Sequence, residues 1–105
     1  MSDYEPSLPP DSAMPELRAR IDMLDAKLVA LLAERSALID EAARIKAREH
    51  LPARISSRVE EVAANARRLA EVQGLDPDLA ERLWRLMMDH FIAQEDRFLA
   101  NDLQG

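Results

Sequence analysis

The sequence predicts an all-α fold with three helices per chain. Leu, Ala, Glu and Arg dominate, β-branched residues do not alternate with polar ones, and glycine occurs only at Gly74 and Gly105. Because glycine and proline interrupt helices, their positions divide the chain into three long helical segments. The absence of cysteine excludes disulfides, thiol catalysis and Cys-ligated metal sites.

The first helix is expected to start near Pro15 and to continue until just before Pro52. About 35 residues at ~1.5 Å each give a rod of roughly 50 Å, whereas a compact chain of this length has a diameter of roughly 33 Å. The apolar positions of the rod keep a heptad repeat, which is typical of long paired helices. We therefore expect an intertwined, two-fold symmetric homodimer, with a monomeric three-helix hairpin and a projecting tail as the alternative.

Local signals set the limits of the other two helices. Ser57 and Glu60 have capping-box spacing at the start of the second helix, and Gly74 is placed to end it. The third helix is expected to open at Asp76–Pro77, an N-cap followed by proline, and to run to about residue 101.

Composition indicates one domain, with 48% hydrophobic and 32% charged residues. We expect a flexible, polar leader over residues 1–13, a helical domain over 14–101 and a short tail over 102–105. No membrane-spanning run or signal-peptide pattern is present, so we expect a cytoplasmic protein. The net charge of -6 argues against nucleic acid or an anionic membrane as the main partner.

Cationic side chains interrupt the apolar face of the first helix. Steps of three and four from Leu17 lead to Arg35, and Lys46 follows in nearly the same helical direction. Taken alone, Arg35 could specify helix register and Lys46 could complement the helix dipole. Arg18 lies ~40 Å from Lys46 along one helix, so one chain cannot readily bring the two side chains together. An antiparallel partner helix would place the start of one helix near the middle of the other, so Arg18 could complete a site that contains Arg35 of the second copy.

Two further charges stand on apolar faces. Arg58 shares a face of the second helix with Ile55 and Val62, where a solvent-reaching arginine is the alternative. Glu95 falls in a stripe with Phe91 on the third helix, where a carboxylate must be paired or protonated.

These residue types predict a pocket for a small polyanion, such as a dicarboxylate held by bidentate guanidinium contacts. No serine has a convincing histidine partner, and His50 and His90 lack metal-ligand spacing. We therefore expect neither a nucleophile, a metal nor a cofactor. Such a site could bind, compact and electrostatically stabilise a dianion without covalent chemistry.

The ordered spacing of several segments resembles that of a known family, the all-helical class of chorismate mutases with their isochorismate pyruvate-lyase relatives. The segments are "LRARID", "LVALLAERSALIDEAARIKARE", "LPARISSRVEEV" and "GLDPDLAERLWRLMMDHFIAQED", and the resemblance covers about residues 14 to 100. It implies an intertwined homodimer with two equivalent pockets and no cofactor. The implied reaction is the [3,3]-sigmatropic rearrangement of chorismate to prephenate, a shikimate-pathway step of aromatic amino acid biosynthesis.

Carried over position by position, the resemblance implies that Arg35 and Arg58, with Arg18 from the other subunit, hold the substrate carboxylates. Lys46 would contact the ether oxygen and a carboxylate. Glu95 falls where many members place a glutamine that donates to the same oxygen. The other implied substrate contacts are Ile55, Val59, Met88, Phe91 and Ile92.

The sequence departs from the family pattern at three of these positions. Ile55 and Val59 stand where mutases of this class often have acidic side chains that contact the ring hydroxyl. An apolar residue at 59 is more similar to the pyruvate lyases and to the mutases of 4-amino-4-deoxychorismate. Glu95 must be protonated to donate to the ether oxygen, so we expect mutase activity to fall as pH rises.

Three functions therefore stay open. Chorismate mutase is the first, and isochorismate pyruvate lyase or 4-amino-4-deoxychorismate mutase is the second. The third is a non-catalytic helical dimer that binds an acidic protein through its cationic face. The resemblance also leaves open a larger shikimate-pathway enzyme as an activating partner.

Overall fold

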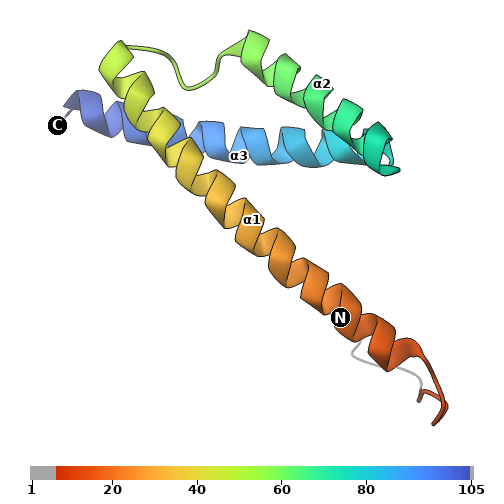
Figure 1. Ribbon diagram of the computed structural model, residues 1–105. Coiled ribbons are helices and arrows are strands. Elements are labelled where there is room, and N and C mark those ends of the chain that lie inside the picture. The colour runs from red at the N-terminus through yellow and green to blue at the C-terminus, as the bar shows by residue number, and fades with distance from the viewer. Residues whose placement is uncertain (1–6, 105) are drawn as a thin grey trace. The chain divides into compact units, whose positions relative to one another are not determined.

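The computed structural model describes residues 7–104 and contains three helices and, over that range, no strand. The helices are α1 (Met14–Glu49), α2 (Ser56–Gln73) and α3 (Pro77–Gln104), as Figure 1 shows. The predicted all-α class and three-helix order are confirmed. The chain divides into two compact units, one ending at Ser36 and the other beginning at Ala37, so α1 contributes to both.

Helix α1 spans 36 residues and has a defined end on each side. At its start, the Ser12 hydroxyl oxygen accepts a hydrogen bond from the Met14 N–H at 3.1 Å. At its end, His50 adopts a left-handed conformation with φ 58°, and the Leu51 N–H donates to the Lys46 carbonyl at 2.9 Å. A left-handed residue with a Cβ is strained, so this helix end carries a conformational cost.

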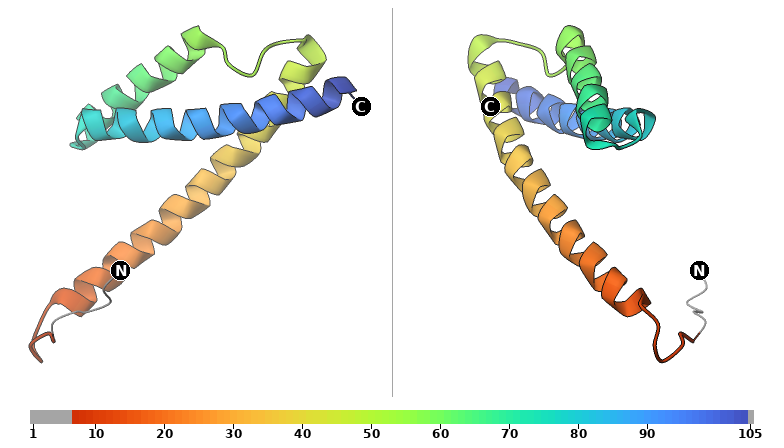
Figure 2. Two further views of the ribbon diagram at one scale, coloured as in Figure 1. Left: turned by 180° about the vertical axis from the view of Figure 1, so that it is seen from behind. Right: turned by 45° about the vertical axis from the view of Figure 1, so that its right-hand side comes forward.

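Helices α2 and α3 form an antiparallel hairpin and lie side by side in both views of Figure 2. Gly74 ends α2 with φ 77°, and the Leu75 N–H donates to the Ala70 carbonyl at 2.8 Å. The Asp76 carboxylate then accepts from the Asp78 N–H at 2.9 Å, which caps α3. The caps predicted at Gly74 and Asp76 are confirmed.

The capping box predicted for α2 is wrong. The N-cap residue is Ile55, which is extended and offers no side-chain hydrogen bond, so Ser57 already lies inside the helix. Glu60 turns instead to Arg85 of α3, with carboxylate to guanidinium distances of 2.9 and 3.1 Å. The tertiary ion pair has replaced the local cap.

The core of the hairpin is built from small side chains. Steps of four and three along α2 bury Val59, Ala63, Ala66 and Ala70. Val59 and Ala63 pack with Met88 of α3, and the partly buried side chains around this cluster are Val62, Trp84 and Ile92. Alanine at successive contact positions lets the two helix backbones approach closely.

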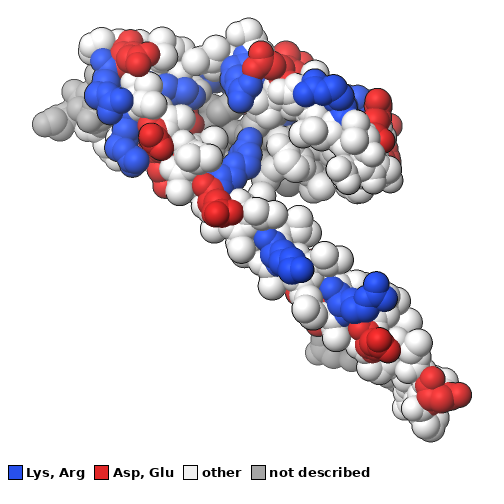
Figure 3. Space-filling view, viewed as in Figure 1, with Lys and Arg blue, Asp and Glu red and all other residues white. Residues whose placement is uncertain are grey.

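The unit that ends at Ser36 leaves its large apolar side chains exposed. Leu24, Leu28 and Leu31 are 58%, 57% and 60% exposed. Basic and acidic side chains alternate with uncharged surface along this part of α1 in Figure 3. A leucine stripe of this kind is an apolar helix face that is open for burial against another helix.

Among the residues that the structure describes, no helix is both long and apolar enough to cross a membrane.

Candidate functional site

A partly buried ion pair joins α1 to α3 in the unit that begins at Ala37. The Lys46 Nζ lies 2.6 Å from the Glu95 Oε2, and the two side chains are 17% and 6% exposed. Glu95 is the buried charged residue among those described. Because burial of a lone carboxylate is costly, Lys46 is the partner that Glu95 needs, and the paired alternative of the sequence prediction is the one observed.

Lys46 also fixes the segment between α1 and α2. Its ammonium donates to the Ala53 carbonyl at 2.7 Å as well as to Glu95. An ammonium has three N–H donors, so one donor is left over for a ligand. The four-carbon stem is thereby held in one orientation before any ligand arrives.

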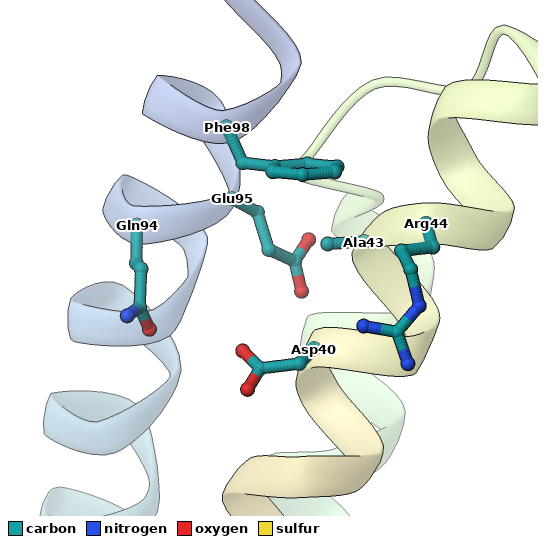
Figure 4. A pocket seen from close by; sticks show the side chains of 6 residues that line it. All are labelled: Asp40, Ala43, Arg44, Gln94, Glu95 and Phe98. Carbon is teal, nitrogen blue, oxygen red and sulfur yellow. The ribbon is translucent and has the colours of Figure 1, made fainter. Parts of the chain in front are cut away.

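Two cavities adjoin this ion pair. A cavity of about 240 Å³ has Glu95 in its wall, which points from α3 toward Ala43 of α1 (Figure 4). Its other lining residues are Asp40, Arg44, Gln94 and Phe98. A larger cavity of about 500 Å³ is lined by Lys46, Ala47, the segment 50–53 and Asp96, Leu99 and Ala100. The larger one falls in the size range of small-molecule sites.

The predicted apolar contacts lie partly in the hairpin core. Val59 and Met88 are buried in one cluster, and Ile92 packs against it. Ile55 and Phe91 are half-buried, and the Phe91 ring meets the His90 ring edge-on at a centroid distance of 5.1 Å. None of these five side chains is in the wall of either cavity.

The predicted carboxylate-binding arginines are distributed over the two units of the chain. Arg58 is exposed and forms an ion pair with Glu61 of its own helix. Arg18 and Arg35 belong to the unit that ends at Ser36, where Arg18 is exposed and Arg35 is half-buried. The structure thus brings together Lys46 and Glu95, and separately Val59, Met88 and Ile92.

Sequence reasoning missed the contact between Arg54 and Asp89. The Arg54 guanidinium donates to the Asp89 carboxylate at 2.8 Å and links the segment after α1 to α3. Both side chains are exposed and belong to unrelated sequence patterns, so no periodicity could have revealed the pair.

A charged network across the α2–α3 hairpin was also missed. Arg85 binds Glu60 and Glu81, and Arg67 binds Glu81 and Asp78. The hydrogen bonds from Arg85, with its charge, hold the pKa of Glu60 below its ordinary value. The pKa of Glu81 is lowered by hydrogen bonds from Arg85 and Arg67. Only the Glu81–Arg85 spacing of four residues could have signalled part of this network.

Among the described residues, no group of three or more His, Asp or Glu side chains is arranged to hold a metal ion.

Comparison with known proteins gives one consistent result. Residues 17–96 match the family model described as chorismate mutase type II. The chain is 37% identical over 82 residues to the T-protein of Enterobacter agglomerans, covering 77% of this chain and 22% of that protein. It is 32% identical over 94 residues to the bifunctional chorismate mutase/prephenate dehydratase of the same organism, covering 90% and 24%.

A shorter relative is similar over nearly its whole length. The chain is 26% identical over 84 residues to the chorismate mutase of Methanocaldococcus jannaschii, covering 80% of this chain and 85% of that protein. By contrast, the chain spans less than a quarter of the two T-proteins that it matches, at 22% and 23%.

Proposed function

Because the chain belongs to the chorismate mutase type II family, we propose that it converts chorismate to prephenate by a [3,3]-sigmatropic rearrangement. The observation that carries the proposal for this chain is the buried Lys46–Glu95 pair, which presents one free ammonium donor. A cytoplasmic location goes with this proposal.

In this proposal the enzyme binds the substrate dianion in its compact, chair-like conformation. Arg35 and Arg58 hold the two carboxylates together with Arg18 of the partner subunit. Arg58 would exchange its present partner Glu61 for a substrate carboxylate, which an exposed ion pair permits because such pairs are weak. Pairing guanidinium groups with both carboxylates pre-orients the two ends that must bond.

Lys46 and Glu95 act at the breaking C–O bond. The free N–H of Lys46 donates to the ether oxygen, where negative charge develops in the transition state. Glu95 donates to the same oxygen when it is protonated, and an ionised Glu95 would repel the developing charge. Neither step needs a cofactor or a covalent intermediate.

The active assembly in this proposal is an intertwined homodimer. The exposed leucines of α1 up to Ser36 support it, because a second α1 would bury an apolar stripe that the chain leaves open. An antiparallel partner helix would also bring its Arg18 to the pocket of the other subunit. Two equivalent pockets result from the two-fold symmetry.

Val59 favours a second candidate function. Its side chain is buried and apolar at a position where many mutases carry an acid for the ring hydroxyl. An isochorismate pyruvate lyase, or a mutase of 4-amino-4-deoxychorismate, would not need that acid.

A proton NMR time course separates these functions. Purified protein is mixed with chorismate, and separately with isochorismate, from acidic to neutral pH. The proposal predicts prephenate from chorismate and its loss in Arg35→Ala. Pyruvate and salicylate from isochorismate as the dominant products would assign the lyase reaction instead, and no turnover of either would turn attention to the amino analogue and to partner binding.

A further inference from the structure

The segment between α1 and α2 is fixed to both neighbouring helices at two consecutive residues. The Ala53 carbonyl accepts from the Lys46 ammonium at 2.7 Å, and the Ala53 residue is 2% exposed. The next residue, Arg54, donates to the Asp89 carboxylate of α3 at 2.8 Å. Because α1 and α3 each hold one of two adjacent residues, the position of the Ala53 carbonyl is determined from both sides.

The direction of the Lys46 ammonium depends on that carbonyl. A lysine side chain has a flexible four-carbon stem, so its ammonium can donate in many directions unless hydrogen-bond partners restrict it. Glu95 supplies one fixed acceptor and Ala53 supplies the second. With two of its three N–H donors directed, the third has only one direction left. If the Ala53 carbonyl moved, this third donor would turn away.

The Arg54–Asp89 pair is expected to contribute little to the stability of the fold, because it lies at the surface. The two side chains are 48% and 66% exposed, and exposed ion pairs are weakly stabilising. Its effect is therefore local, on the segment that carries Ala53. We call this ion pair the loop anchor.

We propose that Arg54 and Asp89 are positioning residues that hold the Ala53 carbonyl where it aims the free N–H of Lys46 at the substrate. Neither residue touches the substrate, and both act through Lys46. The inference rests on the proposed function, because it assigns to the loop anchor the alignment of the donor that stabilises the transition state. Loss of the anchor is expected to lower kcat more than it raises KM, since the interaction that weakens forms at the breaking bond.

The test compares two matched variants of the full chain. Asp89→Asn removes the loop anchor, whereas Asp78→Asn weakens an exposed Arg–Asp pair of the same 2.8 Å length at the far end of α3. With chorismate, Asp89→Asn is expected to lower kcat about two- to five-fold, the range that an exposed pair can account for. Asp78→Asn is expected to keep the wild-type kcat.

Two further variants separate positioning from a general loss of structure. Arg54→Ala should give the same loss as Asp89→Asn, and the double variant should lose no more than either one. The exchanged pair Arg54→Asp/Asp89→Arg should recover most of the lost kcat. A double variant whose losses multiply would show that the residues act separately and would overturn the proposal.

Amide hydrogen exchange over residues 50–55 gives a readout that does not depend on turnover. Exchange of the Leu51 N–H, which donates to the Lys46 carbonyl, is expected to be faster in Asp89→Asn than in Asp78→Asn. Equal exchange rates and equal kcat in the two variants would overturn the proposed role of the loop anchor. If the wild-type protein does not convert chorismate, the proposed function fails, and the exchange comparison alone decides whether the anchor holds this segment.

Discussion

At the residue scale, the side chains that interrupt apolar faces turn out to have different partners. Glu95 was expected to be paired or protonated, and it is buried against Lys46. Arg58 was expected along an apolar face with a solvent-reaching side chain as the alternative, and it is exposed and bound to Glu61. A charged residue on an apolar helix face can thus be identified from the sequence, whereas its ion-pair partner depends on tertiary packing.

The variation of kcat/KM with pH should come from the Glu95 carboxyl group. In the proposed mechanism the Glu95 carboxyl group donates to the ether oxygen only when it carries a proton, so wild-type kcat/KM should be lower at higher pH. Glu95→Gln keeps a donor at every pH and should flatten this profile. The pH profiles of kcat/KM for both proteins check the prediction, and identical profiles would remove Glu95 from the mechanism.

The left-handed residues at two helix ends should respond in opposite ways to substitution. His50 has φ 58°, so His50→Gly relieves strain and should raise the free energy of unfolding by about 1 kcal/mol. Gly74 has φ 77° with no atom within 4 Å of an added Cβ, so its substitution meets only a backbone cost. Gly74→Ala should therefore lower the free energy of unfolding by about 1 kcal/mol. Urea unfolding measures both, and a destabilised His50→Gly would contradict the assignment of strain.

At the element scale, helix ends were predictable where local chemistry determines them. Gly74 and Asp76 act within a few residues of their own positions, so their caps could be identified in the sequence. The predicted cap at Ser57 failed because α2 begins at Ser56 with Ile55 as its N-cap, and Glu60 binds Arg85. Sequence patterns do not indicate which contacts form across a hairpin. For the same reason the helical patterns marked Lys46 and Glu95 separately, and only the family resemblance placed both at one oxygen.

The α2–α3 hairpin should lose stability in acid. Arg85 and Arg67 lower the pKa values of Glu60 and Glu81 in the folded state, so these carboxylates stabilise the fold above their ordinary pKa of 4.5. That contribution is lost as the pH falls through the lowered values.

Arg85→Gln should lower the Tm at neutral pH and make the Tm less sensitive to acid, because it removes the bonds to both carboxylates. Circular dichroism melting from neutral pH down to about pH 3 measures this. Arg82→Gln on the same helix is the control, since no ion pair of Arg82 is present within residues 7–104. Equal acid sensitivity of wild type and Arg85→Gln would contradict the role of the network.

At the scale of the whole molecule, the fold of each chain leaves two requirements unmet. The exposed leucines of α1 up to Ser36 need cover, and the proposed dicarboxylate site needs Arg18 of a partner subunit. A second copy that supplies both an apolar helix face and Arg18 would meet the two requirements together. The all-α class could be derived from the sequence, whereas the proposed homodimer rests on the length and heptad repeat of the first helix together with its exposed leucines.

The oligomeric state tests the first requirement. Sedimentation equilibrium should give the mass of two chains, and Leu28→Glu should give one chain without mutase activity, because a charge on the exposed leucine stripe prevents burial. As a control, Lys27→Glu introduces a glutamate next to that stripe, and this variant should stay dimeric. A fully active monomer would refute the shared pocket.

Complementation between two inactive variants tests the shared cationic pocket most directly. Arg18→Ala and Arg35→Ala should each lose mutase activity as homodimers. When the two chains are refolded together in equal amounts, about half of the dimers are mixed, and each mixed dimer contains one site with both arginines. The account predicts that about a quarter of the wild-type activity returns in the mixture. Activity that stays at the level of the separate variants, or a homodimeric variant that retains full activity, would contradict it.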